Sequence, residues 1–505
     1  MRRNLDALAA EDFDLLVIGG GITGGGAALD AALRGLRVAV IDKGDFASGT
    51  SSVSSKLIHG GLRYLEHGDF GLVYESLHER RRLLRNAAHL VHPLRFVLPF
   101  YDGARVPPWK QRLGLTLYDL LAGHDNLQRS RAFPLARLHH DYPALQTQGL
   151  RGGAEFFDAQ MDDARLCIEV MRTAASQGAV VANYVEAAAF EKKEGLIRGV
   201  RALCRSDGRE FSIRARQTLN AAGPWSDAVR QLAGDDAGPA LRPTKGVHVV
   251  APGRGLTAAF LLLHPADGRV FFVIPWLGKT LIGTTDTVCD DPPDKVGVTS
   301  ADVEYLLQGH NHHFIPQLSA TDLLGSFVGL RPLVRSRPGE PSALSREFTL
   351  SASPSGLLTV SGGKYTTYRR MAEVAVDAVV RRLGLRRRCR TRDFRLDGTP
   401  REPWEQFEPT AMIRLQRRHT LEKDDARHLV RRYGLRADDV AAYFERDSVL
   451  RGRVVSEEPD LLAEFAYQRD HEMALAPADF LLRRTRLGLF RPNLLKKPPG
   501  VLTCT

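Results

Sequence analysis

A glycine-rich turn between two apolar runs constrains the fold of this 505-residue chain more than any other feature. Residues 13–18 form an apolar run long enough for one buried parallel strand, and a G-x-G-x-x-G turn at residues 19–24 follows at once. Apolar residues at helical spacing come next, and a second apolar run, 38–41, ends at Asp42. This order of strand, turn, helix, strand and acid predicts a dinucleotide-binding unit.

The glycines of this turn have separate physical roles. Gly19 allows the tight turn, Gly21 lets the backbone approach a pyrophosphate, and Gly24 lets the helix pack closely on the strand. The helix N-terminus offers N–H groups and a partial positive charge to phosphate, while Asp42 is placed to accept a hydrogen bond from a ribose hydroxyl. A glycine-rich loop in another kind of α/β unit is the alternative. Because glycines within a helix cost about 1 kcal/mol each, the run 24–26 favours close approach of a ligand instead.

A segment rich in hydroxyl groups follows the second predicted strand. Residues 48–55 are mostly serine and threonine, and Lys56, His59 and a pair of glycines come after them. Such a run is usually a solvated loop. Directly after a nucleotide-binding strand, however, its hydroxyl and N–H groups can line a long polar cofactor. The extent of the segment fits a flavin dinucleotide better than a nicotinamide dinucleotide.

Residues 49–80, GTSSVSSKLIHGGLRYLEHGDFGLVYESLHER, resemble the FAD-dependent glycerol-3-phosphate dehydrogenases of the aerobic, membrane-associated type. That family belongs to the wider group with the D-amino-acid oxidase fold, and the resemblance runs from residue 13 to the C-terminal part of the chain. It implies an α/β fold: an FAD-binding, Rossmann-like domain with an antiparallel-sheet substrate domain, plus a small α-helical C-terminal domain.

The resemblance also implies where these domains lie along the chain. An FAD-dependent oxidoreductase region is expected at 12–395, followed by the α-helical domain at 396–505. Within the first region we expect FAD-binding segments at about 12–90, 154–230 and 355–385, interleaved with substrate-binding segments at about 91–153 and 240–354.

One non-covalently bound FAD is implied by the resemblance. Residues 218–226 resemble the second nucleotide-side strand of this fold, with Ala222 in place of the usual threonine, and Val185 falls where the chain passes the adenine. A second glycine-rich helix start, at residues 362–363, has N–H groups that can stabilise negative charge on the N1/O2 side of the flavin. The candidate FAD contacts are Gly19, Gly21, Ile22, Thr23, Gly24, Asp42, Lys43, Thr50, Ser51, Ser52, Ser55, Lys56, Leu57, His59, Gly60, Gly61, Val185, Ala222, Gly223, Trp225, Gly362, Gly363, Lys364, Thr366 and Thr367.

A cationic substrate pocket is the second implication of the resemblance. Arg63, Arg331, Arg346 and Lys364 occupy the family motif positions GGLRYL, GLRPL, SREFT and GGKYTTYR, and with Tyr64 they are expected to surround the substrate. A phosphorylated substrate suits such a set, because the guanidinium group binds phosphate with two parallel hydrogen bonds. Solvated surface arginines are the alternative for any one of them.

A proton acceptor is also needed to oxidise a secondary alcohol. His248, in the motif KGVH, is the candidate catalytic base, because an ordinary histidine has a pKa near 6.5 and is largely neutral at working pH. Arg331 or the environment of the bound flavin is the alternative catalytic element, and a histidine that only packs in the core is the competing interpretation. No metal-spaced cluster is evident, and no metal ligand is predicted.

The activity implied by the resemblance is oxidation of sn-glycerol 3-phosphate to dihydroxyacetone phosphate. A hydride passes to flavin N5, and the electrons then pass to a membrane quinone. An oxidase of the same fold, which uses oxygen and produces peroxide, is the nearest alternative. The net charge of +11 also suggests a nucleic-acid-binding scaffold, but no reading module is recognisable, so we expect no nucleic-acid partner. Whether the chain forms a homodimer stays open.

Residues 74–90 predict a basic amphipathic helix with arginines, including Arg80, on its polar face. Residues 106–121 combine Trp109 and basic residues with a leucine-rich helix. Such a composition suits the interface with an anionic lipid surface. A helix packed on the sheet is the alternative for 106–121.

The expected location is the bacterial cytoplasm, with the protein bound peripherally to the inner face of the cytoplasmic membrane. Residues 1–11 are too short and too polar for a signal peptide, and no apolar run reaches the length of about 18 residues that spans a bilayer. The five cysteines show no C-x-x-C spacing, which favours incidental thiols in a reducing compartment.

Overall fold

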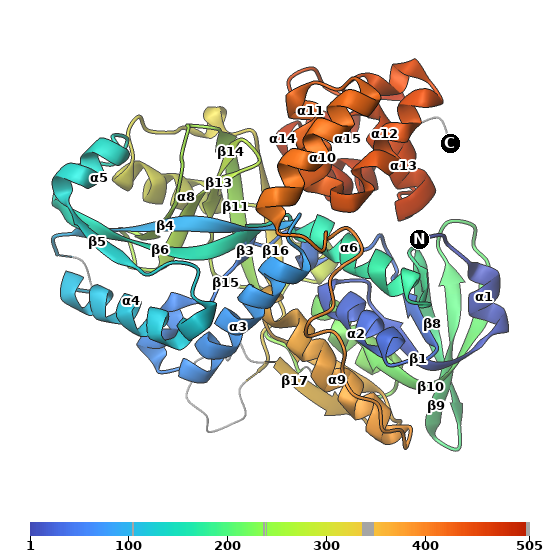
Figure 1. Cartoon of the computed structure of the whole chain (residues 1–505). Coiled ribbons are helices and arrows are strands. Elements are labelled where there is room, and N and C mark those ends of the chain that lie inside the picture. The colour runs from blue at the N-terminus through green and yellow to red at the C-terminus, as the bar shows by residue number, and fades with distance from the viewer. Residues whose placement is uncertain (104–105, 236–237, 239, 336–347, 501–505) are drawn as a thin grey trace.

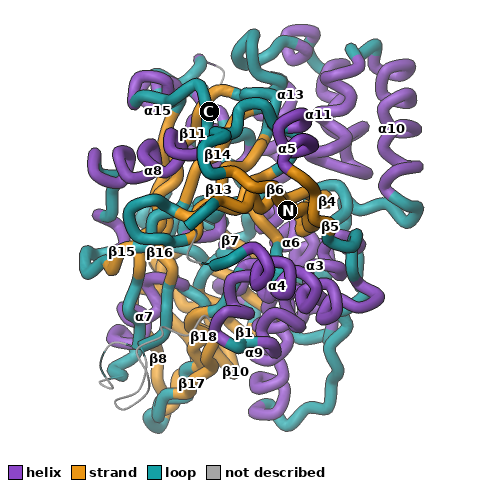
Figure 2. Tube along the Cα trace, turned by 90° about the vertical axis from the view of Figure 1, so that its left-hand side faces the viewer, coloured by secondary structure: helices purple, strands orange, loops and turns teal. Residues whose placement is uncertain are grey.

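The computed structural model describes residues 1–103, 106–235, 238, 240–335 and 348–500. This part of the chain contains two large sheets and a helical C-terminal segment (Figure 1). Figure 2 shows the same molecule turned by 90°, and in both views the helical segment and strand β17 lie at opposite ends.

The first sheet contains the predicted dinucleotide-binding unit. Its main path runs β17-β18-β10-β1-β2-β7, and β1 pairs in parallel with β2 on one side and with β10 on the other. An antiparallel hairpin, β8–β9, extends from β10. The strands are β1 (Asp12–Ile18), β2 (Val38–Ile41), β7 (Val180–Ala182), β8 (Val185–Lys193), β9 (Leu196–Cys204), β10 (Glu210–Asn220), β17 (Phe348–Ala352) and β18 (Leu358–Gly362).

Three helices pack together over this sheet. Helix α2 (Ile22–Leu33) contacts both α6 (Asp163–Ser176) and α9 (Tyr368–Arg382). Nearly all of α2 is buried because it lies between these neighbours. At Gly26 an added Cβ would lie 2.8 Å from the ring of Tyr368 in α9, so the glycine permits the close helix contact. Two short helices, α1 (Leu5–Ala10) and α7 (Ser226–Leu232), complete this part.

The second sheet is antiparallel apart from the pairing of β4 with β12, which confirms the expected substrate-domain architecture. Its main path runs β15-β11-β14-β13-β12-β4-β6-β3, with β16 beside β11 and β5 beside β6. The strands are β3 (Leu57–Ile58), β4 (Val91–Tyr101), β5 (Arg131–Pro134), β6 (Leu150–Met161), β11 (Thr244–Pro252), β12 (Ala259–Leu263), β13 (Val270–Trp276), β14 (Lys279–Gly283), β15 (Thr287–Val288) and β16 (Gly325–Arg331). The accompanying helices are α3 (Phe70–Asn86), α4 (Pro108–Ala122), α5 (Leu135–Asp141) and α8 (Ser300–His313).

The C-terminal segment is helical, as expected, and has its own apolar core around Phe407, Leu429 and Tyr467. Its elements are α10 (Trp404–His419), α11 (Lys423–Tyr433), α12 (Ala437–Ala441), α13 (Leu462–Glu472), a π-helical turn (Asp479–Arg484), α14 (Leu487–Phe490) and α15 (Asn493–Lys496). The π-helical turn and α14 do not form one continuous helix, because Arg486 between them adopts a left-handed conformation with φ of +83°.

Within the described residues no helix has both the length and the apolar character needed to cross a bilayer.

Candidate functional site

A cavity of about 530 Å³ opens where the parallel strands of the first sheet end. Ligands of open α/β sheets bind in this kind of crevice, at the carboxyl ends of the strands. The cavity continues to β11 and β16 of the second sheet, so both sheets contribute to its walls. The candidate FAD contacts that line it are Gly19, Gly21, Ile22, Thr23, Asp42, Lys43, Thr50, Ser51, Ser55, Leu57, His59, Val185, Ala222, Gly223, Trp225, Gly362, Gly363, Lys364 and Thr366.

The glycine turn forms an open cradle in this cavity. A Cβ at Gly19 would lie 2.5 Å from the carbonyl oxygen of Ala221, and one at Gly24 would lie 1.9 Å from that of Gly19, so both positions require glycine for packing. At Gly21 an added Cβ would meet only the Ser51 hydroxyl, at 3.2 Å. The space next to Gly21 is therefore free for a ligand, which fits the predicted approach of a pyrophosphate.

Asp42 lies at the end of β2 and is held in place by the backbone. Its carboxylate accepts hydrogen bonds from the N–H groups of Gly20 (2.6 Å) and Gly44 (2.8 Å). Burial raises the pKa of Asp42 to about 6, and the two hydrogen bonds only partly offset this rise. A partly buried carboxylate at a cavity wall fits recognition of a ribose hydroxyl, because a bound hydroxyl would add a further donor.

Six candidate FAD contacts lie outside the wall of this cavity: Gly24, Ser52, Lys56, Gly60, Gly61 and Thr367. Lys56 is the clearest correction. Its ammonium group is fully buried, donates to both carboxylate oxygens of Asp163 at 2.9 and 2.8 Å, and donates to the carbonyl oxygen of Ser52 at 2.6 Å. Burial lowers the pKa of Lys56 to about 8. Lys56 therefore fixes the hydroxyl-rich loop from behind instead of reaching into the cavity.

The C-terminal segment takes part in fixing this loop. The guanidinium group of Arg486 pairs with Asp163 and with Asp162, at 2.6 Å from the latter, and donates to the carbonyl oxygen of Ser52 at 3.2 Å. All of these side chains are buried or nearly so. The wall of the cavity thus depends on a charge network that joins segments distant in sequence.

His248 lies on β11 and faces the hydroxyl-rich loop. Its Nε2 lies 2.9 Å from Ser55 Oγ, and its Nδ1 has no hydrogen-bond partner among the described residues. Its ring stacks on Phe327 with 4.9 Å between ring centres, while the absence of a side chain at Gly283 leaves room for the opposite face. Burial, with the nearby charges of Lys56 and Arg331, holds the pKa of His248 well below 6.5. The imidazole is therefore neutral at neutral pH.

Arg331 lies at the end of β16 and borders two cavities. Its guanidinium donates to Asp286 Oδ1 and to Thr284 Oγ1, at 3.0 Å each. It lines the large cavity and also a smaller one of about 110 Å³, which Arg63, Tyr64 and Gly61 line as well.

The other predicted substrate residues lie near Arg331, where the two cavities adjoin. Lys364 lines the large cavity, with its ammonium nitrogen 3.7 Å from the centre of the Tyr64 ring, a cation–π geometry. The structure thus brings Arg63, Arg331 and Lys364 to adjoining walls. Arg346 lies outside the described residues.

Two groups near the smaller cavity were not singled out from the sequence. Asp286 pairs with Arg331. Its place in the short polar run 284–286 was the available signal for it in the sequence. Asp158 lines the smaller cavity and pairs with Arg80 at 2.6 Å. Arg80, expected on the polar face of its helix, is thus buried, and Asp158 on the adjacent β6 provides its partner.

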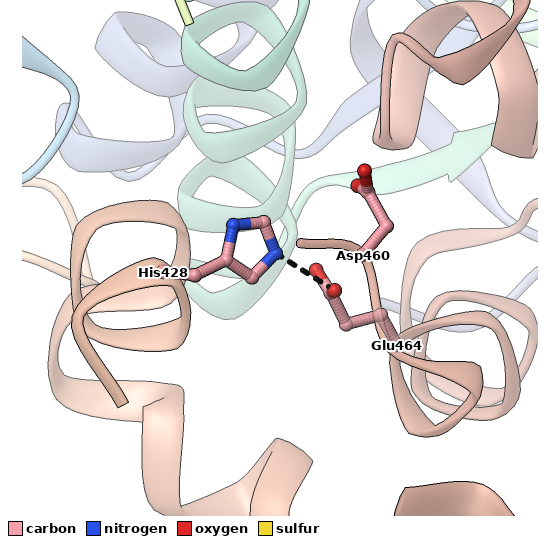
Figure 3. A group of neighbouring side chains, drawn as sticks. All are labelled: His428, Asp460 and Glu464. Atoms are coloured by element: carbon pink, nitrogen blue, oxygen red, sulfur yellow. Dashed lines mark hydrogen bonds and ion pairs between the residues drawn. The ribbon is translucent and has the colours of Figure 1, made fainter. Parts of the chain in front are cut away.

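The C-terminal segment also brings together His428, Asp460 and Glu464, whose potential ligand atoms lie within 4.8 Å of one another (Figure 3). Their distant positions gave no metal-like spacing in the sequence. His428 Nε2 lies 2.9 Å from Glu464, and Arg432 forms ion pairs with both Asp460 and Glu464. Because Arg432 already forms ion pairs with both carboxylates, we interpret the group as a structural charge network.

Comparison with known families matches two sequence models along the chain. The model described as FAD dependent oxidoreductase matches residues 14–369, and the model described as C-terminal domain of alpha-glycerophosphate oxidase matches residues 389–501.

Named relatives match nearly the whole chain. Mitochondrial glycerol-3-phosphate dehydrogenase of Macaca fascicularis is 39% identical over 500 residues, which are 94% of this chain and 68% of the relative. Aerobic glycerol-3-phosphate dehydrogenase of Staphylococcus aureus (strain USA300) is 36% identical over 492 residues, which are 95% of this chain and 87% of the relative.

Solved structures agree with these matches. Glycerol-3-phosphate dehydrogenase from Bacillus halodurans, complexed with FAD, superposes with a TM-score of 0.81 and 33% identity over 98% of this chain and 90% of the other. α-Glycerophosphate oxidase from Mycoplasma pneumoniae with FAD bound has a TM-score of 0.59 at 18% identity, over 78% of this chain and 100% of the other, a likeness of fold.

Proposed function

This chain belongs to the FAD-dependent glycerol-3-phosphate dehydrogenase family, and we propose that it oxidises sn-glycerol 3-phosphate to dihydroxyacetone phosphate. Bound FAD supplies the hydride acceptor. The observation that carries the proposal is the meeting of a neutral buried histidine, His248, with Arg331 and Lys364 on the walls of the cofactor cavity. A proton acceptor and cationic groups are what the oxidation of a phosphorylated alcohol requires.

The residues of the large cavity divide into groups suited to the parts of FAD. The Gly21 cradle and the start of α2 suit the pyrophosphate, Asp42 suits the ribose, and Val185 suits the adenine. The segment Gly362–Gly363 lines the same cavity as His248, and its N–H groups suit the flavin ring. We expect FAD to bind without a covalent bond to the protein.

Binding of the substrate phosphate is assigned to Arg63, Arg331 and Lys364, with Tyr64 beside them and Arg346 retained from the sequence motif. Arg331 is held in position by Asp286, at 3.0 Å. An oriented guanidinium loses less side-chain entropy when it binds an anion, and this favours a tight phosphate contact.

The proton acceptor is assigned to His248. A neutral imidazole has one N–H and one acceptor nitrogen. The Ser55 hydroxyl, 2.9 Å from Nε2, can donate to that nitrogen or accept from it, and the tautomer decides which ring nitrogen accepts the proton of the substrate hydroxyl. The low pKa of His248 makes it a weak base in the empty cavity, but a bound phosphate would raise it, since a nearby anion favours the protonated form. Arg331 stays the alternative catalytic element.

We further propose that the electron acceptor is a membrane quinone and that the chain binds peripherally to the anionic inner face of a bacterial membrane. Exposed apolar side chains on α4, namely Trp109, Leu113 and Leu120, support this proposal. So does the net charge of +11, because basic surfaces are attracted to anionic lipid. An oxidase that delivers electrons to oxygen is the second candidate, and comparing turnover with quinone against oxygen distinguishes them.

The reaction itself is tested by mixing the purified flavoprotein with alcohols in the absence of any acceptor. Glycerol 3-phosphate should bleach the flavin absorption, whereas glycerol and unphosphorylated diols should not. Bleaching by the unphosphorylated alcohols at comparable concentrations would contradict the assigned phosphate pocket.

A further inference from the structure

Arg269, directly before β13, lines the smaller cavity and has no role in the assignments above. This cavity, of about 110 Å³, is also lined by Arg63 and Arg331, so three arginines border the same small space. Arginine side chains keep their positive charge throughout the physiological pH range. An anion in this cavity therefore meets positive charge from three separate segments of the chain.

Acidic residues on the wall of this cavity do not cancel the charge of Arg269. Among the described residues that line it, the acidic ones are Asp158 and Asp286. Asp158 pairs with Arg80, at 2.6 Å, and Arg80 lies outside the wall. Asp286 pairs through its carboxylate with Arg331, at 3.0 Å. Both carboxylates thus have another partner, and Arg269 contributes a positive charge that the acidic residues of the wall do not pair.

Local contacts orient the side chain of Arg269 and leave one of its nitrogens available. Its Nη1 donates to the carbonyl oxygen of Asp286 at 2.7 Å. Asp286 therefore positions two arginines, with its carbonyl oxygen on Arg269 and its carboxylate on Arg331. The Nε of Arg269 lies 3.5 Å from the carboxylate of Asp267, in an exposed pair that solvent weakens. Nη2 has no hydrogen-bond partner among the described residues, so it can donate to an anion in the cavity.

The smaller cavity has an exposed rim and adjoins the cofactor cavity. The Arg269 side chain is 55% exposed, whereas Phe96 on the same wall is buried. His59 and Arg331 line both cavities. A ligand whose anionic group lies beside Arg269 can therefore extend from the smaller cavity into the one that His248 lines.

We propose that Arg269 is a phosphate-binding residue, which completes with Arg63 and Arg331 a site for the substrate phosphate in the smaller cavity. This inference rests on the proposed function. A phosphate monoester carries a charge of about −1.5 to −2 near neutral pH and has three terminal oxygens that accept hydrogen bonds, so it can bind several guanidinium groups at once. Because Arg269 does not line the cofactor cavity, it acts on substrate binding and not on hydride transfer.

Three variants separate the charge of Arg269 from its other contacts. Arg269→Gln removes the charge, whereas Arg269→Lys keeps the charge without the planar, two-pronged donor. Arg254→Gln is the matched control. Arg254 is also exposed, follows β11 in the same sheet and donates to one backbone carbonyl oxygen, that of Pro316, but it lines neither of the two cavities.

The experiment measures single-turnover flavin bleaching of the FAD-containing proteins by glycerol 3-phosphate, at ionic strengths of about 20 mM and about 300 mM, because salt screens exposed charges. We expect Arg269→Gln to raise the half-saturating substrate concentration by about tenfold at the lower ionic strength, since a charge-assisted hydrogen bond is lost. The difference should shrink at the higher ionic strength, and the limiting rate of bleaching should stay at the wild-type value. Arg269→Lys should recover most of the binding, and Arg254→Gln should match wild type. Competitive inhibition by inorganic phosphate should weaken in Arg269→Gln alone.

A half-saturating concentration equal to that of wild type in Arg269→Gln would overturn the proposal, and so would an equal loss of binding in Arg254→Gln. A loss that does not change with ionic strength and that lysine does not restore would also overturn it, because Arg269 would then only hold the carbonyl group of Asp286. Absence of bleaching in wild type would instead reject the proposed function, so the two failures are distinguishable.

Discussion

Ser55 Oγ lies 2.9 Å from Nε2 of His248, so the hydroxyl-rich loop after β2 and the strand β11 meet at the candidate base. The contact joins the loop that follows the first sheet to a strand of the second sheet. It engages one ring nitrogen of His248, and the tautomer at this contact decides which nitrogen can accept a proton. The Ser55–His248 contact thus links the packing of the loop against β11 to the proposed transfer of a proton to His248.

Replacing His248 with alanine should slow flavin reduction by about 10²–10⁴, the usual contribution of a general base. Binding of glycerol 3-phosphate should change less, because the phosphate contacts remain. Single-turnover stopped-flow measurement of flavin bleaching provides both quantities. Reduction within about threefold of wild type, below the range for losing a general base, would show that His248 only packs or orients other groups.

The pH dependence of the same step follows from the pKa of His248. Burial and the charges of Lys56 and Arg331 hold that pKa well below 6.5, so the free enzyme stays in the neutral form through neutrality. The sequence alone suggested a group titrating near neutral pH, and the structure corrects this. At low substrate concentration, protonation of His248 should therefore not slow flavin reduction as the pH falls from 7 to about 6.5, the ordinary pKa of a histidine.

Replacing Gly21 with leucine should abolish FAD binding. An added Cβ there meets only the Ser51 hydroxyl, at 3.2 Å, so the chain accommodates the start of the side chain, which then occupies the space for the pyrophosphate. The ratio of flavin absorption to protein absorption in the purified variant measures the effect. Gly71→Leu is the control, because an added Cβ at Gly71 in α3 meets nothing within 4 Å. Full flavin content in Gly21→Leu would remove the basis for the cofactor assignment.

Replacing Arg331 with alanine should weaken glycerol 3-phosphate binding by about 2–4 kcal/mol, as expected when a charge-assisted partner is lost. Arg346→Ala should act similarly if its motif role holds. Flavin content should stay normal in both. Arg381→Ala, which changes an exposed arginine on α9, is the matched control. Michaelis constants equal to wild type in both variants would place the phosphate pocket elsewhere.

Replacing Arg486 with alanine should destabilise the protein by about 3–5 kcal/mol, because removal of one partner leaves buried charge uncompensated. Its partners Asp162 and Asp163 also hold the loop around Lys56, so FAD retention should fall as well. Denaturant unfolding and flavin content measure the two effects. Arg491, whose side chain is 41% exposed, is a suitable control. Stability equal to that of Arg491→Ala would show that the network contributes little.

The local pattern of residues 12–41 was sufficient to predict β1, α2, β2 and the glycine turn. Each glycine of the turn is present for a local steric reason. The overall fold came from resemblance and is confirmed by the sheets and by the matching families. Most of the FAD contacts that the resemblance implied line a single cavity.

The parts that sequence did not predict depend on partners distant in the chain. Lys56 was expected beside the cofactor, but Asp163 binds its ammonium group behind the loop. Arg80 was expected on the polar face of a helix, but it is buried and pairs with Asp158. Helix α10 also continues through Pro409, although proline ordinarily disfavours a helix interior.

The most direct test of the account is anaerobic mixing of the purified, FAD-containing protein with sn-glycerol 3-phosphate, followed by the flavin absorption. The account predicts complete bleaching, one dihydroxyacetone phosphate formed per flavin reduced, and no bleaching with glycerol at the same concentration. A flavin that remains oxidised with glycerol 3-phosphate, in protein that retains its full FAD content, would contradict the proposed activity.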